Sequence, residues 1–121
     1  MPAKILASSL IFASISSLAY GGQGVCEGTT TTGKTISIEY WLGTTGARTY
    51  AATIRIDNSE AADYALQFSP DGYDLGTATD QSRAAGRDLG PAKFHIYNNF
   101  ENMSGTVGSV TFGGIFCTYT R

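Results

Sequence analysis

Few side chains in this 121-residue chain could carry out acid–base chemistry. His95 is the only histidine, so a nucleophile–base pair has no other imidazole to use. It alternates with apolar residues in the segment 93–98 (KFHIYN), which predicts a strand with His95 on its polar face. The carboxylates Glu39, Glu60 and Glu101 lie on different segments, and their spacing does not predict the facing pair that a glycosidase needs. No G-x-S-x-G motif occurs. These residues therefore argue against a hydrolase.

Metal and phosphate chemistry are also disfavoured. Two cysteines and one histidine are too few ligands for a structural zinc site. The glycine-rich segment 105–114 lacks the Lys-Ser/Thr ending of a phosphate-binding loop. We therefore expect neither a metal nor a cofactor.

The N-terminal residues have the pattern of a secretory signal peptide. A short basic start, residues 1–4, precedes an apolar, serine-containing run over 5–19, and Ser17 and Ala19 stand at the −3 and −1 positions of a cleavage site. We therefore expect a secreted product, residues 20–121, that forms a single domain and has no membrane span. Its charge is weakly acidic, because the whole chain has 8 Lys+Arg against 10 Asp+Glu. Such a balance does not favour a polyanionic partner.

Two cysteines in a secreted chain predict one disulfide, Cys26–Cys117, which would tie the two ends of the domain together. Closing so long a loop stabilises a small domain by roughly 4–5 kcal/mol in the chain-entropy treatment. Near the second cysteine, Asn102-Met103-Ser104 is an N-glycosylation sequon, so Asn102 is a candidate for glycan attachment.

Most of the remaining sequence is typical of strands. Runs of β-branched and aromatic residues separated by turn residues predict strands at 50–56, 64–68, 93–98, 106–112 and 115–119. The polar stretch 71–91 is predicted to be mostly loop, with a short helix around 81–85 capped by Asp80. In the segment 33–42, apolar residues at every second position favour a strand, but the same residues also fit helical spacing. Periodicity alone leaves that element open.

The order of these segments resembles the powdery-mildew RNase-like effectors expressed in haustoria, the RALPH group, whose fold is that of the small fungal guanyl-preferring ribonucleases. The resemblance runs over nearly the whole of residues 20–121. It consists of short matches to C-D/E-G-T, Y-P-A-T, R-Q-F-P, V-K-Y-Y-I and K-C-T-F, found at Cys26–Thr29, Tyr50–Thr53, Leu66–Phe68, Ala92–Ile96 and Phe116–Tyr119. The aromatic-x-Cys motif of the group is absent, because Gly24 precedes Val25 and Cys26.

The resemblance implies an α+β, ribonuclease-like fold in which one helix packs on a curved antiparallel sheet and a disulfide joins the termini. It places the helix at 33–42. It also implies that catalysis is lost, because Ala52, Gln67 and Lys93 stand where the ribonucleases carry His, Glu and Arg, and no second histidine follows His95. The chain is therefore expected to be a pseudo-ribonuclease and not an enzyme.

The function that this resemblance implies is that of a secreted, avirulence-type effector. Such a protein would enter the host cell cytoplasm as a monomer and bind host plant proteins, either a target or an immune receptor. The residues that we expect at its interaction surface are Tyr73, Asp74, Arg83, Arg87 and Tyr97.

Three other hypotheses stay open. The first is weak RNA binding without cleavage, through stacking and cations such as Lys93 and Arg55. The second is an active ribonuclease with a rearranged site around His95 and Glu101. The third is an unrelated β-rich secreted binding module.

Overall fold

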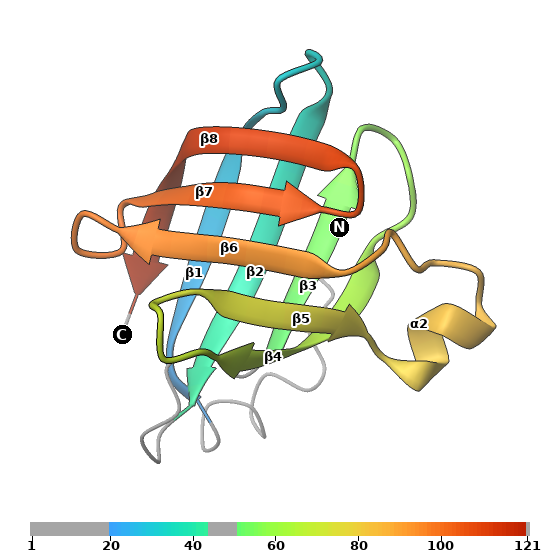
Figure 1. Cartoon of the computed structure of the whole chain (residues 1–121), viewed down its shortest axis with the longest axis horizontal. Helices are drawn as coiled ribbons and strands as arrows, with labels where there is room; N and C mark the ends of the chain where they lie inside the picture. Colours follow the sequence, from blue (N-terminus) through green and yellow to red (C-terminus); the bar gives the residue numbers. More distant parts are fainter. Residues whose placement is uncertain (1–19, 44–50, 121) are drawn as a thin grey trace.

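The computed structural model describes residues 20–43 and 51–120, which form a closed antiparallel barrel (Figure 1). Each strand pairs with the next one along the chain, and the last pairs with the first. The strands are β1 (Tyr20–Thr29), β2 (Thr35–Gly43), β3 (Ala51–Ile56), β4 (Ala62–Phe68), β5 (Asp74–Ala78), β6 (Ala92–Tyr97), β7 (Asn102–Val107) and β8 (Val110–Thr120). The predicted signal peptide, residues 1–19, lies outside the described residues.

The predicted ribonuclease-like α+β fold is wrong. The described chain has no helix packed across a sheet, and its single helix, α2 (Asp80–Ala84), lies beside β4 and β5 at one end of the barrel (Figure 1). The expected helix at 33–42 is instead strand β2, in which Ile36, Ile38, Tyr40 and Leu42 are buried and the residues between them are not. Apolar residues at every second position all lie on one face of a strand, and that face is buried here. The alternation therefore predicts this element correctly, and the helix implied by the resemblance is wrong.

Other predicted boundaries also differ from the structure. The stretch 71–91 holds strand β5 as well as α2, and the helix is capped by Thr79, whose side chain accepts from the Ser82 N–H, in place of Asp80. The segment 106–112 is not one strand, because a turn at Gly108 and Ser109 separates β7 from β8. The predicted break at 113–114 lies inside β8, beside a shift in register.

Inward-facing side chains fill the barrel. The largest fully buried ones come from seven strands and are Tyr40, Tyr64, Phe94, Phe112, Ile38, Ile54, Met103, Val107 and Asp74. An eight-stranded barrel has an interior just wide enough for side chains to fill. The surface that the described residues offer to a partner is therefore the outer wall. No helix among them is long and apolar enough to cross a membrane.

The segment that joins β5 to β6 is tied to the barrel by two buried hydroxyl groups. The Ser82 side chain accepts a hydrogen bond from the Asp63 N–H at 2.9 Å, which holds α2 against β4. The Tyr64 hydroxyl donates to the Gly90 carbonyl at 2.6 Å and accepts from the Leu89 N–H at 3.2 Å. Burial of this phenol raises the pKa of Tyr64.

The predicted disulfide is confirmed. Cys26 in β1 lies directly opposite Cys117 in β8, and a bond joins their sulfur atoms across the pair of strands that closes the barrel. Cys26 is buried and Cys117 is partly buried. The bond therefore links strands that are 91 residues apart in the chain.

Removing the disulfide through Cys26→Ala with Cys117→Ala should lower the free energy of unfolding by roughly 4–5 kcal/mol, because the unfolded chain regains the freedom of a 91-residue loop. Urea unfolding followed by circular dichroism measures this change. Reduction of the natural chain, which keeps both cysteines, is the control and should give a similar loss. A urea midpoint that stays unchanged in both samples would contradict the prediction.

Close strand contact predicts a second effect on stability. At Gly105 in β7 an added Cβ would lie 2.2 Å from the Lys93 carbonyl oxygen and 2.6 Å from the Phe94 Cα, whereas at Gly113 it would meet no atom within 4 Å. Gly105→Ala should therefore destabilise the barrel by about 1–3 kcal/mol, because backbone atoms must shift. Gly113→Ala is the matched control. Equal melting temperatures for the two variants would disprove this account of β6–β7 packing.

Candidate binding surface

Strand β6 carries a row of polar and aromatic side chains on the outer wall. Phe94 and Ile96 point into the core. The residues that alternate with them, Lys93, His95 and Tyr97, therefore face outward. The predicted placement of His95 on the polar face of a strand is confirmed, and the side chain is partly buried by its neighbours.

The turn before β5 brings a second tyrosine to this row. The Tyr73 and His95 ring centroids are 5.6 Å apart with planes tilted by 52°, and the His95 and Tyr97 centroids are 5.5 Å apart with planes at 9°. We call Tyr73, His95 and Tyr97 the aromatic strip. Tyr73 is 36% exposed and Tyr97 is 37% exposed, so both tyrosines remain accessible.

Hydrogen bonds hold the turn in place beneath the strip. The Ser69 N–H donates to the Tyr73 carbonyl at 2.7 Å, and the Gly72 N–H donates to the Ser69 carbonyl at 3.0 Å. Gly72 has φ +92°, a conformation that favours glycine. Its carbonyl lies 2.9 Å from His95 Nδ1. Because a carbonyl can only accept, Nδ1 carries the proton, and this bond fixes both the tautomer and the ring orientation.

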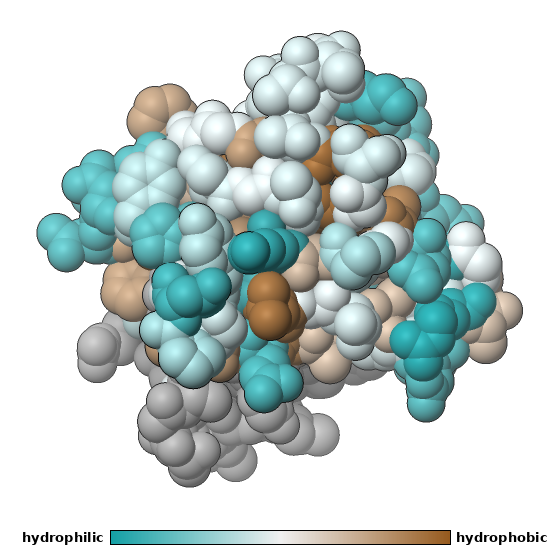
Figure 2. Space-filling model, in the orientation of Figure 1, coloured by the Kyte–Doolittle hydropathy of each residue, from teal (hydrophilic) through white to brown (hydrophobic). Residues whose placement is uncertain are grey.

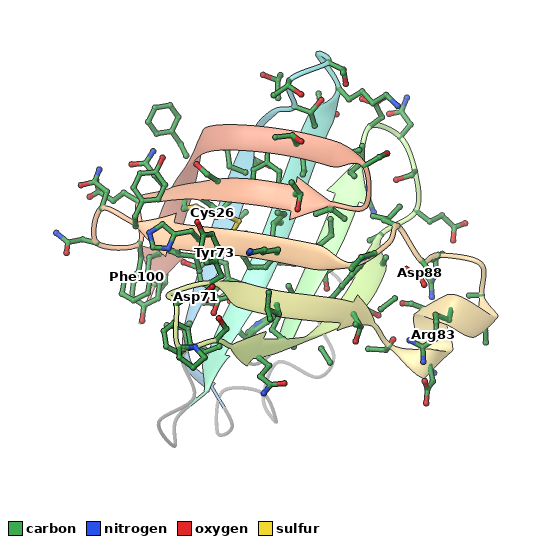
Figure 3. The ribbon with its side chains drawn as sticks, in the orientation of Figure 1. Cys26, Asp71, Tyr73, Arg83, Asp88 and Phe100 are labelled. Carbon is green, nitrogen blue, oxygen red and sulfur yellow. A yellow bond between two sulfur atoms is a disulfide. The ribbon has the colours of Figure 1, made fainter. Side chains whose placement is uncertain are left out.

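Charged and hydroxyl groups border the aromatic strip. The Lys93 ammonium lies 4.5 Å from the centre of the Tyr73 ring, within cation–π range. The Asp71 carboxylate lies in the same turn as Tyr73 (Figure 3) and accepts from the Ser69 hydroxyl. At the other end, the Tyr97 hydroxyl is 3.3 Å from Ser104 Oγ, which also accepts from the Gly114 N–H.

The Ser69 hydroxyl, followed by backbone N–H groups and the positive charge of Lys93, holds the pKa of Asp71 below its ordinary value. Asp71 is therefore negatively charged beside the aromatic strip at neutral pH.

A shallow groove of about 610 Å³ lies across the outer faces of β4, β5 and β6, and Lys93, which borders the strip, is one of its lining residues. Gly76 forms part of its lining. Leu75, which is 43% exposed, lies between Gln67 on β4 and Lys93 on β6 in the strand register. Figure 2 shows a small hydrophobic patch over β5 with hydrophilic side chains on either side. The groove therefore combines an apolar centre with hydrogen-bonding edges.

The predicted interaction surface is only partly brought together. Tyr73 and Tyr97 meet through His95, which the prediction left out although it shares a strand face with Tyr97. The prediction for Asp74 is wrong, because this carboxylate is fully buried in the barrel. Arg83 belongs to α2, on the opposite side of the view from Tyr73 (Figure 3).

The two arginines of the predicted interaction surface, Arg83 and Arg87, form polar contacts in and near α2. Arg83 donates to the Ala78 carbonyl and pairs with Asp80, while Arg87 lies 3.8 Å from the Glu60 carboxylate. Neither belongs to the aromatic strip.

The positions expected to be degenerate catalytic residues do not form one site. Ala52 is buried on the inner face of β3, whereas Gln67 and Lys93 lie on the outer wall. The candidate glycosylation residue Asn102 begins β7, where its side chain accepts from the Asn98 amide and donates to the Gly114 carbonyl. Glycan attachment there stays a prediction.

Comparisons with protein-family models, curated proteins and solved structures find no match to this chain. Within residues 20–43 and 51–120, no group of three or more His, Cys, Asp or Glu side chains could hold a metal ion. The geometry of the outer wall is therefore the basis for assigning a role.

Replacing the hydroxyl that bonds Asp71 should change the titration of this carboxyl group. In Ser69→Ala the pKa of Asp71 should rise toward its ordinary value, because the largest interaction that lowers it is gone. A carboxyl group with a lowered folded pKa stabilises the fold above its unfolded pKa, and this contribution is lost as the pH falls through the folded value. Carbon-detected NMR titration of the Asp71 carboxyl, in the natural chain and in the variant, measures the change. An unchanged Asp71 curve would contradict the assignment.

Proposed function

We propose that this chain is a secreted binding protein that acts without catalysis, and that the aromatic strip is its contact surface. The observation that carries the proposal is the assembly of three rings on the outer wall, each within 5.6 Å of the next. The separate turn that supplies Tyr73 is locked to His95 by a hydrogen bond. These rings stand outside the hydrophobic core, so packing of the barrel interior does not explain their position.

Fixed aromatic rings favour binding energetically. Tyrosine offers a large contact area while losing little conformational entropy, which is why it is enriched at binding hot spots. Here the stacking of His95 on Tyr97 and the hydrogen bond to the Gly72 carbonyl restrict the rings before a partner arrives. Less freedom is then lost on binding, and more of the contact energy contributes to affinity.

The proposal retains the binding role and the secretion that the sequence predicts. It corresponds to the hypothesis of a β-rich secreted binding module. The plant host, the immune receptor and delivery into the host cytoplasm followed from the resemblance to ribonuclease-like effectors, whose fold the barrel does not share. We therefore do not include them in the proposal.

Small ring compounds should bind at the aromatic strip. In protein-observed NMR titrations with phenol, indole, uridine and methyl glucoside, we expect saturable shifts centred on Tyr73, His95 and Tyr97, because these rings offer accessible stacking surfaces. Tyr73→Ala with Tyr97→Ala should weaken the binding of those compounds about tenfold or more. Arg83→Ala is the control and should leave it unchanged.

Two outcomes would count against the proposal. Saturable binding that survives the double tyrosine variant would place the contact surface elsewhere. Cleavage of single-stranded or ribosomal RNA by the purified, oxidised protein would contradict the absence of catalysis and would direct attention to His95 and Glu101.

A further inference from the structure

We propose that the ligand of the aromatic strip is a neutral oligosaccharide whose successive sugar units extend into the groove over β4, β5 and β6. This inference rests on the proposed function and names the class of ligand for the same surface. It is argued from the chemical mixture on the outer wall, from its charge and from the continuity of the strip with the groove.

The surface offers apolar faces and hydrogen-bonding groups in close alternation. The rings of Tyr73 and Tyr97 are flanked by the Asp71 carboxylate, the Lys93 ammonium and the Ser104 hydroxyl. A pyranose ring has the complementary chemistry, because its C–H face packs on an aromatic ring while its hydroxyl groups both donate and accept hydrogen bonds. A ligand with only apolar groups would leave these polar side chains desolvated without partners, which is costly.

The charge argues against a polyanionic ligand. The chain has a net charge of −2, and the cation beside the strip, Lys93, is accompanied by the ionised Asp71 on the same turn as Tyr73. Nucleic-acid binding relies on clustered cations that replace counterions along the phosphates. A neutral oligosaccharide has no phosphate charges and therefore needs no clustered cations.

The distribution of apolar residues argues against a flat protein interface. Core regions of protein interfaces are apolar and depleted in charge. On this wall the exposed Leu75 is flanked by Gln67 and Lys93, and Figure 2 shows its strand carrying only a small hydrophobic patch among hydrophilic side chains. Around Leu75 the exposed apolar surface is therefore the size of a single side chain, as packing against one sugar ring requires.

The groove provides a path for further sugar units. Lys93 lies over the Tyr73 ring and also lines the groove, so it joins the two regions. The strand register places Lys93 in one row with Gln67, Leu75 and Thr106, and this row crosses four strands. An apolar residue between amide, ammonium and hydroxyl groups repeats the mixture found at the strip.

Titration of the protein purified from the medium after secretion tests the inference. The probes are neutral tetrasaccharides of glucose, N-acetylglucosamine, mannose and xylose, with a single-stranded RNA oligonucleotide as the polyanionic alternative. We expect at least one tetrasaccharide to give saturable NMR shifts at both the aromatic strip and the groove residues Leu75 and Thr106. The matching monosaccharide should bind at least about tenfold more weakly, because it contacts only one of the two regions.

Variants separate stacking from other contributions. Tyr73→Ala or Tyr97→Ala should each weaken tetrasaccharide binding about tenfold or more, whereas Tyr73→Phe and Tyr97→Phe keep the rings and should stay within about threefold of the natural chain. Thermal melting confirms that each variant is folded.

Three results would overturn the inference. They are the absence of saturable binding across the tetrasaccharides, binding that the alanine variants leave intact, or strip-dependent binding of the RNA alone. If phenol, indole or uridine still binds at the strip while methyl glucoside and the tetrasaccharides do not, the proposed function stands and the oligosaccharide assignment fails. If neither binds there, both fail.

Discussion

The pairing of β1 with β8 is the constraint on which the rest of the described structure depends. These strands come from opposite ends of the domain, and their ladder converts a series of neighbouring hairpins into a closed wall. Closure removes the free strand edges of the sheet and gives the inner faces of all the strands a common interior. The Cys26–Cys117 bond crosses this ladder, so it stabilises the contact with the greatest loss of chain entropy.

Closure also determines where a ligand can bind. The interior is filled by tyrosine, phenylalanine and aliphatic side chains, which leaves the outer wall as the accessible surface of the described residues. The alternation that sends Phe94 inward sends Lys93, His95 and Tyr97 outward, so one pattern builds both the core and the proposed binding surface. The core and the proposed binding surface therefore lie on opposite faces of the same strands.

The aromatic strip depends on a contact between two segments that are not adjacent in the sequence. Tyr73 precedes β5 and His95 lies in β6, and α2 with its connections separates them along the chain. The hydrogen bond from His95 Nδ1 to the Gly72 carbonyl joins these segments at the surface. A side chain that could look like an isolated histidine in the sequence thus becomes the centre of a preorganised cluster.

Local physical chemistry in the sequence indicated several of the strands, the short helix and the disulfide partners, but it did not indicate β1 or β5. The period of two in 35–43, the Ser69–Gly72 turn and the two cysteines all act over a few residues or admit only one pairing, so they could be recognised without coordinates. The misplaced break at 113–114 shows the limit of that signal, because glycine pairs mark bulges as well as turns.

Only the tertiary structure decided that the sheet closes, that Asp74 lies inside the barrel and that Tyr73 meets Tyr97 through His95. Each of these outcomes depends on strand register and on contacts between distant segments, which the periodicity of a single segment does not encode.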